Sequence, residues 1–352
     1  MSMLIFTYFN LALITLSLIN TQQHLSIQLP SPMQAFRFEG IDLSATNENK
    51  TSAKLWAKRD DLIHPIISGN KWRKLAEIFT HAESLPQRII SFGGGYSNHL
   101  HALAYTCHTL GIPFHAIIRG NYAEHLTPCL RDIISWHGEC IWSTKFDYKR
   151  RHDADYLDTL QSQYPDALII PEGGASLMAL SGVAQSVEEL TRQMQGFSQQ
   201  RNLIITPVAT AATLVGIIHG VAHAQNKGQL QHTDILGIAV LKPHSQESAD
   251  YLVQATEQLL HSAQTLSEVI GTDPILFPSW SISLDYHTGG YAKSSTELND
   301  FCTKFSHDNF IIEPVYSGKS FYALQDLLKN QQLDHYDNII IYHTGGLQGI
   351  RK

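Results

Sequence analysis

After Pro30 the sequence alternates short apolar runs, rich in β-branched and aromatic residues, with longer amphipathic stretches, and several short runs end in glycine-rich turns. This succession predicts a parallel β-sheet covered by helices, and therefore an α/β fold. Ligands of such sheets bind outside the carboxyl ends of the strands, so the turns after the strands should carry the chemistry. The expected strands are 53–58, 88–92, 114–118, 139–142, 167–170, 203–205, 234–239 and 338–342. The expected helices are 71–82, 98–110, 127–136, 181–195, 213–225, 248–262 and 318–330.

The composition argues against several classes of protein. With 25 Lys and Arg against 32 Asp and Glu, the formal net charge of -7 provides no basic surface for nucleic acid. The four cysteines are widely spaced and form no C-x-x-C pair, which indicates neither a disulfide framework nor a thiolate zinc site and fits a reducing, cytoplasmic location. The 19 histidines are interpreted as scattered, so no catalytic metal is expected.

Residues 1–30 begin with an almost wholly apolar run between Met3 and Ile19. A signal peptide or a membrane anchor would contain such a run, but a basic flank is missing and no small-residue cleavage site clearly follows. We therefore interpret residues 1–30 as an extension outside the fold, and keep a surface helix and an export signal as alternatives. No membrane partner is expected.

One lysine stands where a turn enters a helix. In the segment Ser68-Gly69-Asn70-Lys71, Gly69 and Asn70 suit a tight turn, and Lys71 falls in the first turn of the expected helix. The positive end of a helix dipole disfavours an ammonium group and favours the neutral amine that imine formation requires. A lysine after a Gly-Asn turn is also common on exposed surfaces, so the functional interpretation depends on the other turns.

Two further turns are suited to anions. Three glycines at 93–95 end an apolar strand and precede Ser97 and Asn98, which are N-cap residue types at the start of a helix. A buried strand ending at Ile205 leads through Thr210 to a helix that begins near Thr213, and both hydroxyls could hold a phosphate there. Taken singly, each could equally be an ordinary connection between a strand and a helix.

Five motifs follow one another in order: S-G-N-K-x-R-K-L (68–75), G-G-x-x-S-N-H (93–99), P-E-G-G (171–174), P-V-Y-x-G-K-S (314–320) and H-T-G-G (343–346). With them the chain resembles the 1-aminocyclopropane-1-carboxylate (ACC) deaminase and D-cysteine desulfhydrase family of fold-type II enzymes that depend on pyridoxal 5'-phosphate (PLP). The resemblance covers the chain from about residue 31 to its end. It implies two open parallel-sheet domains with PLP between them, as in the tryptophan synthase β fold. Residues 31–73 and 182–352 would form the large PLP-binding domain and residues 74–181 the small α/β domain, in a homodimer.

The resemblance implies roles in cofactor binding. Lys71 would hold PLP as an imine and, once released from it, carry protons at the substrate. Asn98 would bind the ring hydroxyl, and Ser317 takes the position that faces the pyridine nitrogen. The phosphate loop corresponds to Ala209, Thr210, Ala211, Ala212 and Thr213.

The substrate implied by the resemblance is a small amino acid. Its carboxylate would be received by Ser97 and by the N–H groups of Asn98 and His99. In the deaminases the matching serine is also discussed as a nucleophile on the cyclopropane ring. Tyr316 matches a tyrosine that faces the substrate, and Tyr291 is a second candidate on a looser alignment.

The phosphate loop departs from the pattern of most relatives. Ala209, Ala211 and Ala212 stand where glycines are common. Alanine resists a positive φ and restricts the close approach of backbone to phosphate. The loop could therefore bind PLP more weakly, unless its backbone angles lie in the ordinary α or β regions.

A second departure from the family pattern bears on which of the two activities, ACC deamination or D-cysteine desulfhydration, the chain has. ACC deaminases place a Glu beside the active-site tyrosine, where the carboxylate keeps the pyridine nitrogen protonated, whereas this chain has Ser317. A hydroxyl offers only a neutral hydrogen bond, so the ring should be a weaker electron sink. Elimination tolerates a weak sink because a leaving group departs, while opening a cyclopropane has no such leaving group.

The leading hypothesis is therefore a D-cysteine desulfhydrase-like α,β-elimination that gives pyruvate, ammonia and hydrogen sulfide. The main alternative is an ACC deaminase that gives 2-oxobutyrate and ammonia. A PLP-binding protein with little turnover, motivated by the alanines of the phosphate loop, and a dehydratase of serine or threonine are further alternatives.

Overall fold

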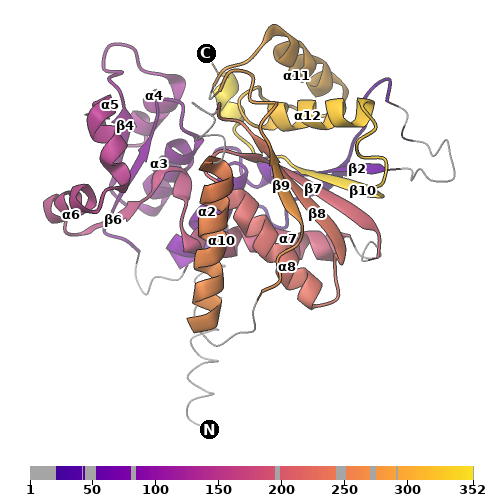
Figure 1. Ribbon diagram of the computed structural model, residues 1–352. Helices are drawn as coiled ribbons and strands as arrows, with labels where there is room; N and C mark the ends of the chain where they lie inside the picture. The colour runs from indigo at the N-terminus through magenta and orange to yellow at the C-terminus, as the bar shows by residue number, and fades with distance from the viewer. Residues whose placement is uncertain are drawn as a thin grey trace.

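The chain forms two β-sheets, each covered by helices on both faces, and the two resulting lobes lie side by side (Figure 1). This arrangement comes from a computed structural model. It describes residues 21–41, 43, 53–80, 85–194, 199–242, 251–269, 275–290 and 292–351. The predicted α/β fold with two parallel-sheet units is confirmed.

The larger sheet has six strands in the order β1-β2-β10-β7-β8-β9. All neighbouring pairs are parallel except β1 with β2, so the short β1 forms an antiparallel edge. The central strands are buried on both faces and therefore read as continuous apolar runs. The strands are β1 (Met33–Ala35), β2 (Lys54–Lys58), β7 (Arg201–Val208), β8 (His232–Ala239), β9 (Trp280–Ser283) and β10 (Asn338–Tyr342).

Two groups of helices cover opposite faces of this sheet. Side chains alternate between the faces: Ile204 and Ile340 pack with α7, α8 and α10, whereas Ile205 and Ile339 pack with α11 and α12. Figure 1 shows the two groups on either side of β7 and β10. The helices are α7 (Leu177–Gln193), α8 (Ala212–Asn226), α10 (Tyr251–Val269), α11 (Thr296–Asp308) and α12 (Ser317–Lys329).

The smaller sheet has four parallel strands in the order β5-β4-β3-β6. One apolar cluster joins α3 and α4 to one face, and a second cluster joins the other face to Tyr148 and Leu160 of the next two helices. The strands are β3 (Arg88–Gly93), β4 (Phe114–Arg119), β5 (Glu139–Ser143) and β6 (Ala167–Ile170). The helices are α3 (Asn98–Leu110), α4 (Pro128–Ser135), α5 (Lys145–Lys149) and α6 (Ala154–Gln163).

The helix α2 (Asn70–Thr80) lies between the two lobes, where it packs on α7 and also contacts α3. Its Trp72 and Phe79 are buried in the apolar cluster of the smaller lobe. The 3-10 turns are η1 (Asp60–Leu62), η2 (Arg150–His152), η3 (Glu172–Gly174) and η4 (Leu347–Ile350).

The folded part of the chain begins earlier in the sequence than expected. Leu25 is buried in the same cluster as Trp72, and the Gln28 N–H donates to the carbonyl of Ile63. The expectation that residues 1–30 lie outside the fold is therefore wrong for residues 21–30, and residues 1–20 lie outside the described part of the chain. None of the helices in the described residues is both long enough and apolar enough to cross a membrane.

Candidate active site

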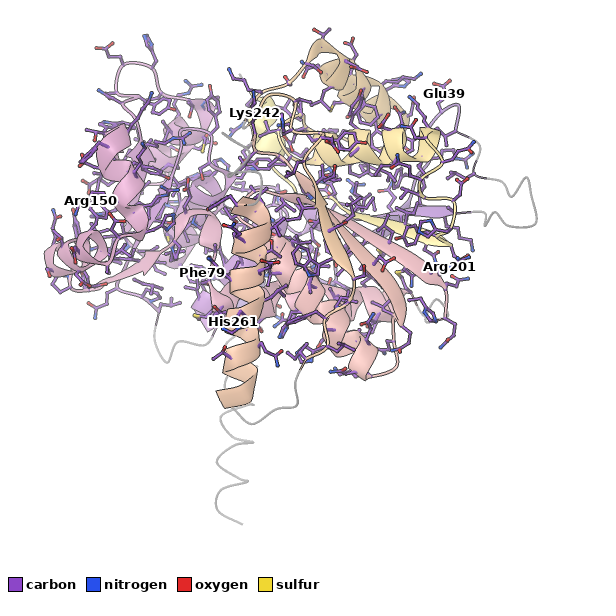
Figure 2. The ribbon with its side chains drawn as sticks, in the orientation of Figure 1. Glu39, Phe79, Arg150, Arg201, Lys242 and His261 are labelled. Carbon is purple, nitrogen blue, oxygen red and sulfur yellow. The ribbon has the colours of Figure 1, made fainter. Side chains whose placement is uncertain are left out.

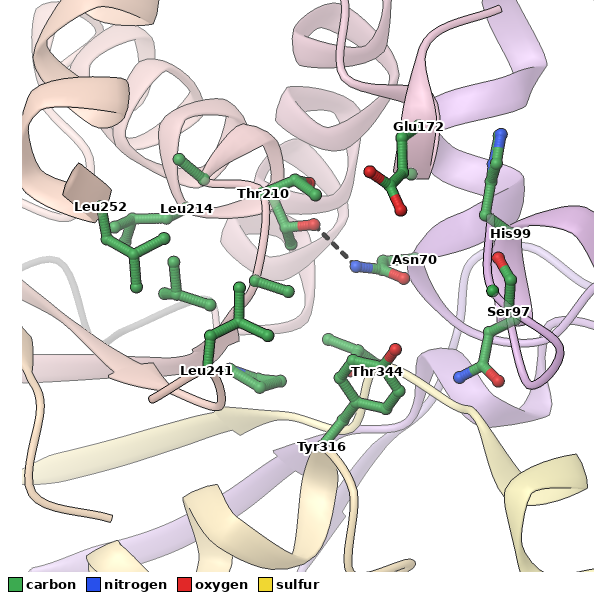
Figure 3. A pocket seen from close by; sticks show the side chains of 18 of the residues that line it. Asn70, Ser97, His99, Glu172, Thr210, Leu214, Leu241, Leu252, Tyr316 and Thr344 are labelled. Carbon is green, nitrogen blue, oxygen red and sulfur yellow. Dashed lines mark hydrogen bonds between the residues drawn. The ribbon is translucent and has the colours of Figure 1, made fainter. Parts of the chain in front are cut away.

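A cavity of about 940 Å³ lies between the lobes, at the ends of β3 and β7 and at the beginnings of α2, α3, α8 and α12. Its position agrees with the rule that ligands bind at the carboxyl ends of parallel strands. Figure 3 shows Asn70, Thr210, Ser97 and Tyr316 around it. The predicted site residues that line the cavity together are Lys71, Ser97, Asn98, His99, Ala209, Thr210, Ala211, Thr213 and Tyr316.

Lys71 is the second residue of α2, and its amine reaches the cavity wall. Burial lowers the pKa of Lys71 to about 8, and the carboxylate of Glu313 opposes this shift. The Lys71 ammonium donates to the side-chain oxygen of Asn70, whose amide nitrogen in turn donates to Thr213 Oγ1 at 2.6 Å. A partly neutral amine at a cavity wall is the state that an imine-forming lysine needs.

Close contact between two motifs fixes the turn before Lys71. A Cβ added to Gly69, where φ is 69°, would lie 1.7 Å from the Thr344 carbonyl oxygen. The Asn70 N–H donates to the same carbonyl oxygen at 3.3 Å. The glycine in S-G-N-K is therefore required by the backbone of H-T-G-G, and the two motifs form one structural unit.

Lys74 is a site residue that sequence reasoning did not assign. It lies one turn after Lys71 on α2 and lines the cavity, with its ammonium 3.1 Å from the Gly173 carbonyl oxygen and 3.4 Å from Thr210 Oγ1. Burial and the neighbouring Lys71 hold the pKa of Lys74 well below its ordinary value. No acidic side chain pairs with it within the described ranges. The spacing of three residues from Lys71 was the available signal, because it places both lysines on one helix face.

The turn from β7 into α8 contains a strained alanine. Ala211 has φ 59° and ψ -28°, which is the left-handed region, and the Ala212 N–H donates to the Thr210 carbonyl across it at 2.7 Å. No side chain caps α8, so the next N–H groups of its first turn face the cavity side without a helical acceptor. The alternative that all loop angles are ordinary is therefore wrong for Ala211. Ala212 is buried in the helix and does not line the cavity.

The beginning of α3 faces the cavity from the smaller lobe. Ser97 is its N-cap, and the Ser97 hydroxyl oxygen accepts the Leu100 N–H at 3.2 Å, which leaves the hydroxyl hydrogen available. Asn98 lines the cavity, and its side-chain oxygen accepts from the amide of Gln348.

His99 supplies a neutral ring beside these groups. Its Nε2 lies 2.8 Å from Ser91 Oγ, and because that hydroxyl donates to the Ile170 carbonyl, its oxygen must accept from Nε2–H. Burial, with help from Lys71 and Lys74, lowers the pKa of His99 to about 3. Nδ1 is then an acceptor with no protein partner among the described residues. His99 therefore adds no positive charge at neutral pH.

At the beginning of α12, a tyrosine lines the cavity and a carboxylate is buried next to it. Tyr316 lines the cavity, whereas Ser317 is fully buried and does not. The Glu313 carboxylate accepts the N–H groups of Val315, Tyr316 and Ser317 and lies 3.2 Å from Ser317 Oγ. Burial raises the pKa of Glu313 to about 7, and these hydrogen bonds oppose the shift. Tyr291, the second predicted tyrosine, lies outside the described residues.

The cavity wall of the smaller lobe includes an ion pair. Glu172 of P-E-G-G lines the cavity and accepts from Arg151 Nε at 2.6 Å and from Tyr148 OH at 2.7 Å. The charged stretch 145–153 looks like a solvated connection in the sequence, but it forms α5 and η2 and places Arg151 at the cavity.

Buried charges hold α2 in place. Arg73 pairs with Asp60 at 2.9 Å and with Glu189 at 2.6 Å, and Lys58 pairs with Glu189 at 2.8 Å. Ser31 Oγ donates to Asp60 at 2.6 Å. This buried network ties α2 to β2 and α7, so the arginine of S-G-N-K-x-R-K-L has a structural role.

The sequence interpretation overlooked one histidine pair. His219 and His223 are four residues apart on α8, with ring centroids 4.6 Å apart, which is the H-x-x-x-H spacing of two ligands on one helix face. Within the described ranges, no third His, Cys, Asp or Glu completes a metal site with them.

Comparisons with known proteins identify the family of this chain. Residues 41–345 match the family described as pyridoxal-phosphate dependent enzyme. The mitochondrial bifunctional D-cysteine desulfhydrase/1-aminocyclopropane-1-carboxylate deaminase of Arabidopsis thaliana is 25% identical over 348 residues, covering 92% of this chain and 77% of its own. The D-cysteine desulfhydrase of Serratia proteamaculans is 26% identical over 330 residues, covering 88% and 94%. A crystal structure of an ACC deaminase homologue superimposes with a TM-score of 0.71 at 24% identity, covering 94% of this chain and 96% of that one.

Proposed function

Since the chain belongs to the family of pyridoxal-phosphate dependent enzymes, which it matches over residues 41–345, we propose that it eliminates the β-substituent of a small amino acid. The reaction we favour is a D-cysteine desulfhydrase-like α,β-elimination that gives pyruvate, ammonia and hydrogen sulfide. The observation that carries this choice is the beginning of α12, where the residue after Tyr316 is a serine buried outside the cavity lining, and the Glu313 carboxylate is engaged by backbone N–H groups.

One observation above all indicates that the residues of the cavity can bind PLP, the cofactor of the family. The Lys74 amine is buried beside Thr210 with a lowered pKa and no carboxylate partner in the described part of the chain, and a bound phosphate would favour its ammonium form and pair with it. Thr213 and the uncapped beginning of α8 add donors on the same side. Lys71 would bind the cofactor covalently, and Asn98 would donate to its ring hydroxyl.

PLP, when bound, supplies an electron sink next to the Cα atom of an amino acid. The residues around it would bind the substrate and transfer its protons. The α3 N-terminus would hold the substrate carboxylate through the Ser97 hydroxyl and the N–H groups of Asn98 and His99. The Lys71 amine, with its pKa near 8, would take the Cα proton, and Tyr316 would face the leaving group. The sulfur at Cβ would then depart with its electron pair and gain a proton, and water would hydrolyse the released 2-aminoacrylate to pyruvate and ammonia.

Steady-state assays of the purified protein with D-cysteine, β-chloro-D-alanine and ACC would test this choice. We expect pyruvate from the first two substrates and little 2-oxobutyrate from ACC. Turnover of ACC alone would contradict the proposal and establish the deaminase instead, an alternative that the name of the Arabidopsis relative supports. Activity on serine or threonine but not on cysteine would point to a dehydratase.

A spectral measurement tests the remaining alternative, a PLP-binding protein with little turnover. Wild-type protein loaded with PLP should show a visible absorption band that the Lys71→Ala variant lacks. A band without product from any substrate would support that alternative, whereas the absence of a band in the wild type would contradict both enzyme proposals.

Three proposals about organisation accompany this function. The division into a large domain (31–73 and 182–352) and a small domain (74–181), a homodimer, and a cytoplasmic location all follow from the family resemblance or from the free cysteines. Limited proteolysis would test the first, analytical ultracentrifugation the second, and cell fractionation the third.

A further inference from the structure

The ammonium group of Lys319 lies in a cage of backbone carbonyl oxygens. Lys319 belongs to α12 and is fully buried. Its Nζ donates to the carbonyl oxygens of Val240 at 3.1 Å, His287 at 2.8 Å and Gly290 at 2.8 Å. Since an ammonium has three N–H donors, the cage uses all of them.

The carbonyls of the cage come from two segments at the edge of the cavity, which we call the rim loops. The first is 240–242, which follows β8, and the second is 287–290, which follows β9. Leu241, Lys242, Gly289 and Gly290 of these loops line the cavity, and Lys242 projects near the junction of the lobes (Figure 2). A Cβ added to Gly290 would lie 3.2 Å from the Cβ of Lys242, so the two rim loops lie close together.

The charge of Lys319 is balanced by dipoles. No carboxylate forms an ion pair with Lys319 within the described ranges, and Glu313 acts on it only at longer range. A small cation surrounded by carbonyl oxygens in place of water is how proteins bind dehydrated potassium ions. The cage therefore has the chemistry of a monovalent cation site that a side chain already fills.

We propose that Lys319 is a positioning residue that acts as a built-in monovalent cation and holds the two rim loops together at the edge of the cavity. The wild-type protein should then need no potassium or ammonium ion. Truncating the side chain should expose an empty cage that such an ion can enter. The inference shares the cavity with the proposed function but does not depend on which reaction takes place there.

The experiment compares Lys319→Ala with Lys319→Met in the PLP-loaded protein. Alanine leaves the cage empty, whereas methionine fills it with an uncharged side chain. Hydrogen exchange of the rim-loop amides and PLP affinity are measured in choline, potassium and ammonium chloride at equal ionic strength. In choline we expect both variants to bind PLP about tenfold more weakly, the order of one hydrogen bond from a charged donor. Potassium or ammonium should restore protection and affinity in the alanine variant only.

Lys329→Ala is the matched control, because Lys329 is an exposed lysine on the same helix and should respond to no cation. Three results would overturn the inference: a wild type that itself requires potassium, an alanine variant indifferent to the cation, or equal recovery of both variants. If Lys319→Ala does not fold in choline, the same measurements are made in the three salts on Lys319→Gln, which keeps hydrogen-bond donors without the charge. Hydrogen exchange needs no turnover, so a failure of the proposed elimination would be seen separately.

Discussion

Two helices begin at the same cavity but begin differently. At α3 the side chain of Ser97 caps the first turn, and its φ of -70° is ordinary. At α8 no side chain caps the first turn, and Ala211 takes a left-handed φ of 59°. A capped N-terminus is already satisfied when the site is empty, while an uncapped one gains most from a permanent anion. From this comparison we infer that the beginning of α3 binds the substrate transiently, whereas the beginning of α8 binds the phosphate of the cofactor permanently.

The largest expected effect is on the α8 side, at Lys74. Lys74→Met removes the ammonium beside Thr210 and should weaken PLP binding about a hundredfold, because a buried anion loses its charged partner. Equilibrium titration of PLP by its visible absorption measures this. Lys227→Met, at the far end of α8, should leave the affinity unchanged. Equal PLP affinity for wild type and Lys74→Met would remove Lys74 from the phosphate site.

On the α3 side, Ser97→Ala should act on the substrate and spare the cofactor. We expect kcat/KM to fall about tenfold to a hundredfold, the range for a hydrogen bond to a charged group, with PLP affinity little changed. Ser176→Ala is the control, because Ser176 caps α7 with the same 3.2 Å bond and does not line the cavity. Both variants should lose about 1 kcal/mol of stability as cap substitutions. A loss of PLP affinity in Ser97→Ala would break the distinction between the two helices.

Lys71 lines the same cavity as these two helix starts, and its titration should be visible in the capture of PLP by the apoprotein. Only the neutral amine reacts, and burial lowers the pKa of Lys71 to about 8. The capture rate should therefore rise about tenfold per pH unit below that pKa and level off above it. Stopped-flow absorbance across pH 6 to about 10 measures the profile. A rate that still rises at the ordinary lysine pKa would mean that Lys71 is solvated, and Ser97→Ala should not move the profile.

The smallest effect is expected at the strained alanine. Ala211→Gly should raise the free energy of unfolding by about 0.5 to 1 kcal/mol, because glycine adopts a positive φ without the strain, although it also loosens the unfolded chain. Chemical denaturation measures the change. Ala222→Gly, in the interior of α8, should instead destabilise by about 1 kcal/mol. A destabilised Ala211→Gly would show that Ala211 is not strained.

The parts of the fold that could be predicted have strong local signals. The helix α3 begins after three glycines and a serine cap and ends at Gly111 in a left-handed conformation, and its predicted bounds agree with the structure. The edge strand β1 has only three residues, and β9 is partly exposed with no clear alternation, so neither gave a usable pattern. The charges of 145–153 concealed α5, because a short charged segment has the composition of a loop.

The site was predictable only where a motif names a residue. Lys71, Ser97 and Tyr316 reach one cavity as expected. The spacing from Lys71 could place Lys74 on the cavity face of α2, but it does not reveal the contact of Lys74 with the Gly173 carbonyl. The contacts of Lys319 with the rim loops likewise depend on groups far along the chain. The left-handed angle of Ala211 was likewise hidden, because the sequence shows an alanine where the backbone behaves as a glycine.

The buried network under α2 also constrains how this protein can change over generations. Replacing Arg73 alone would leave Asp60 without its ion-pair partner and Glu189 with Lys58 alone, a loss of several kcal/mol. Replacing all the charges together by apolar residues could be nearly neutral. We therefore expect the residues of this network to change together during evolution or to stay unchanged: Lys58, Asp60, Arg73 and Glu189. The same constraint preserves α2, the helix that carries Lys71.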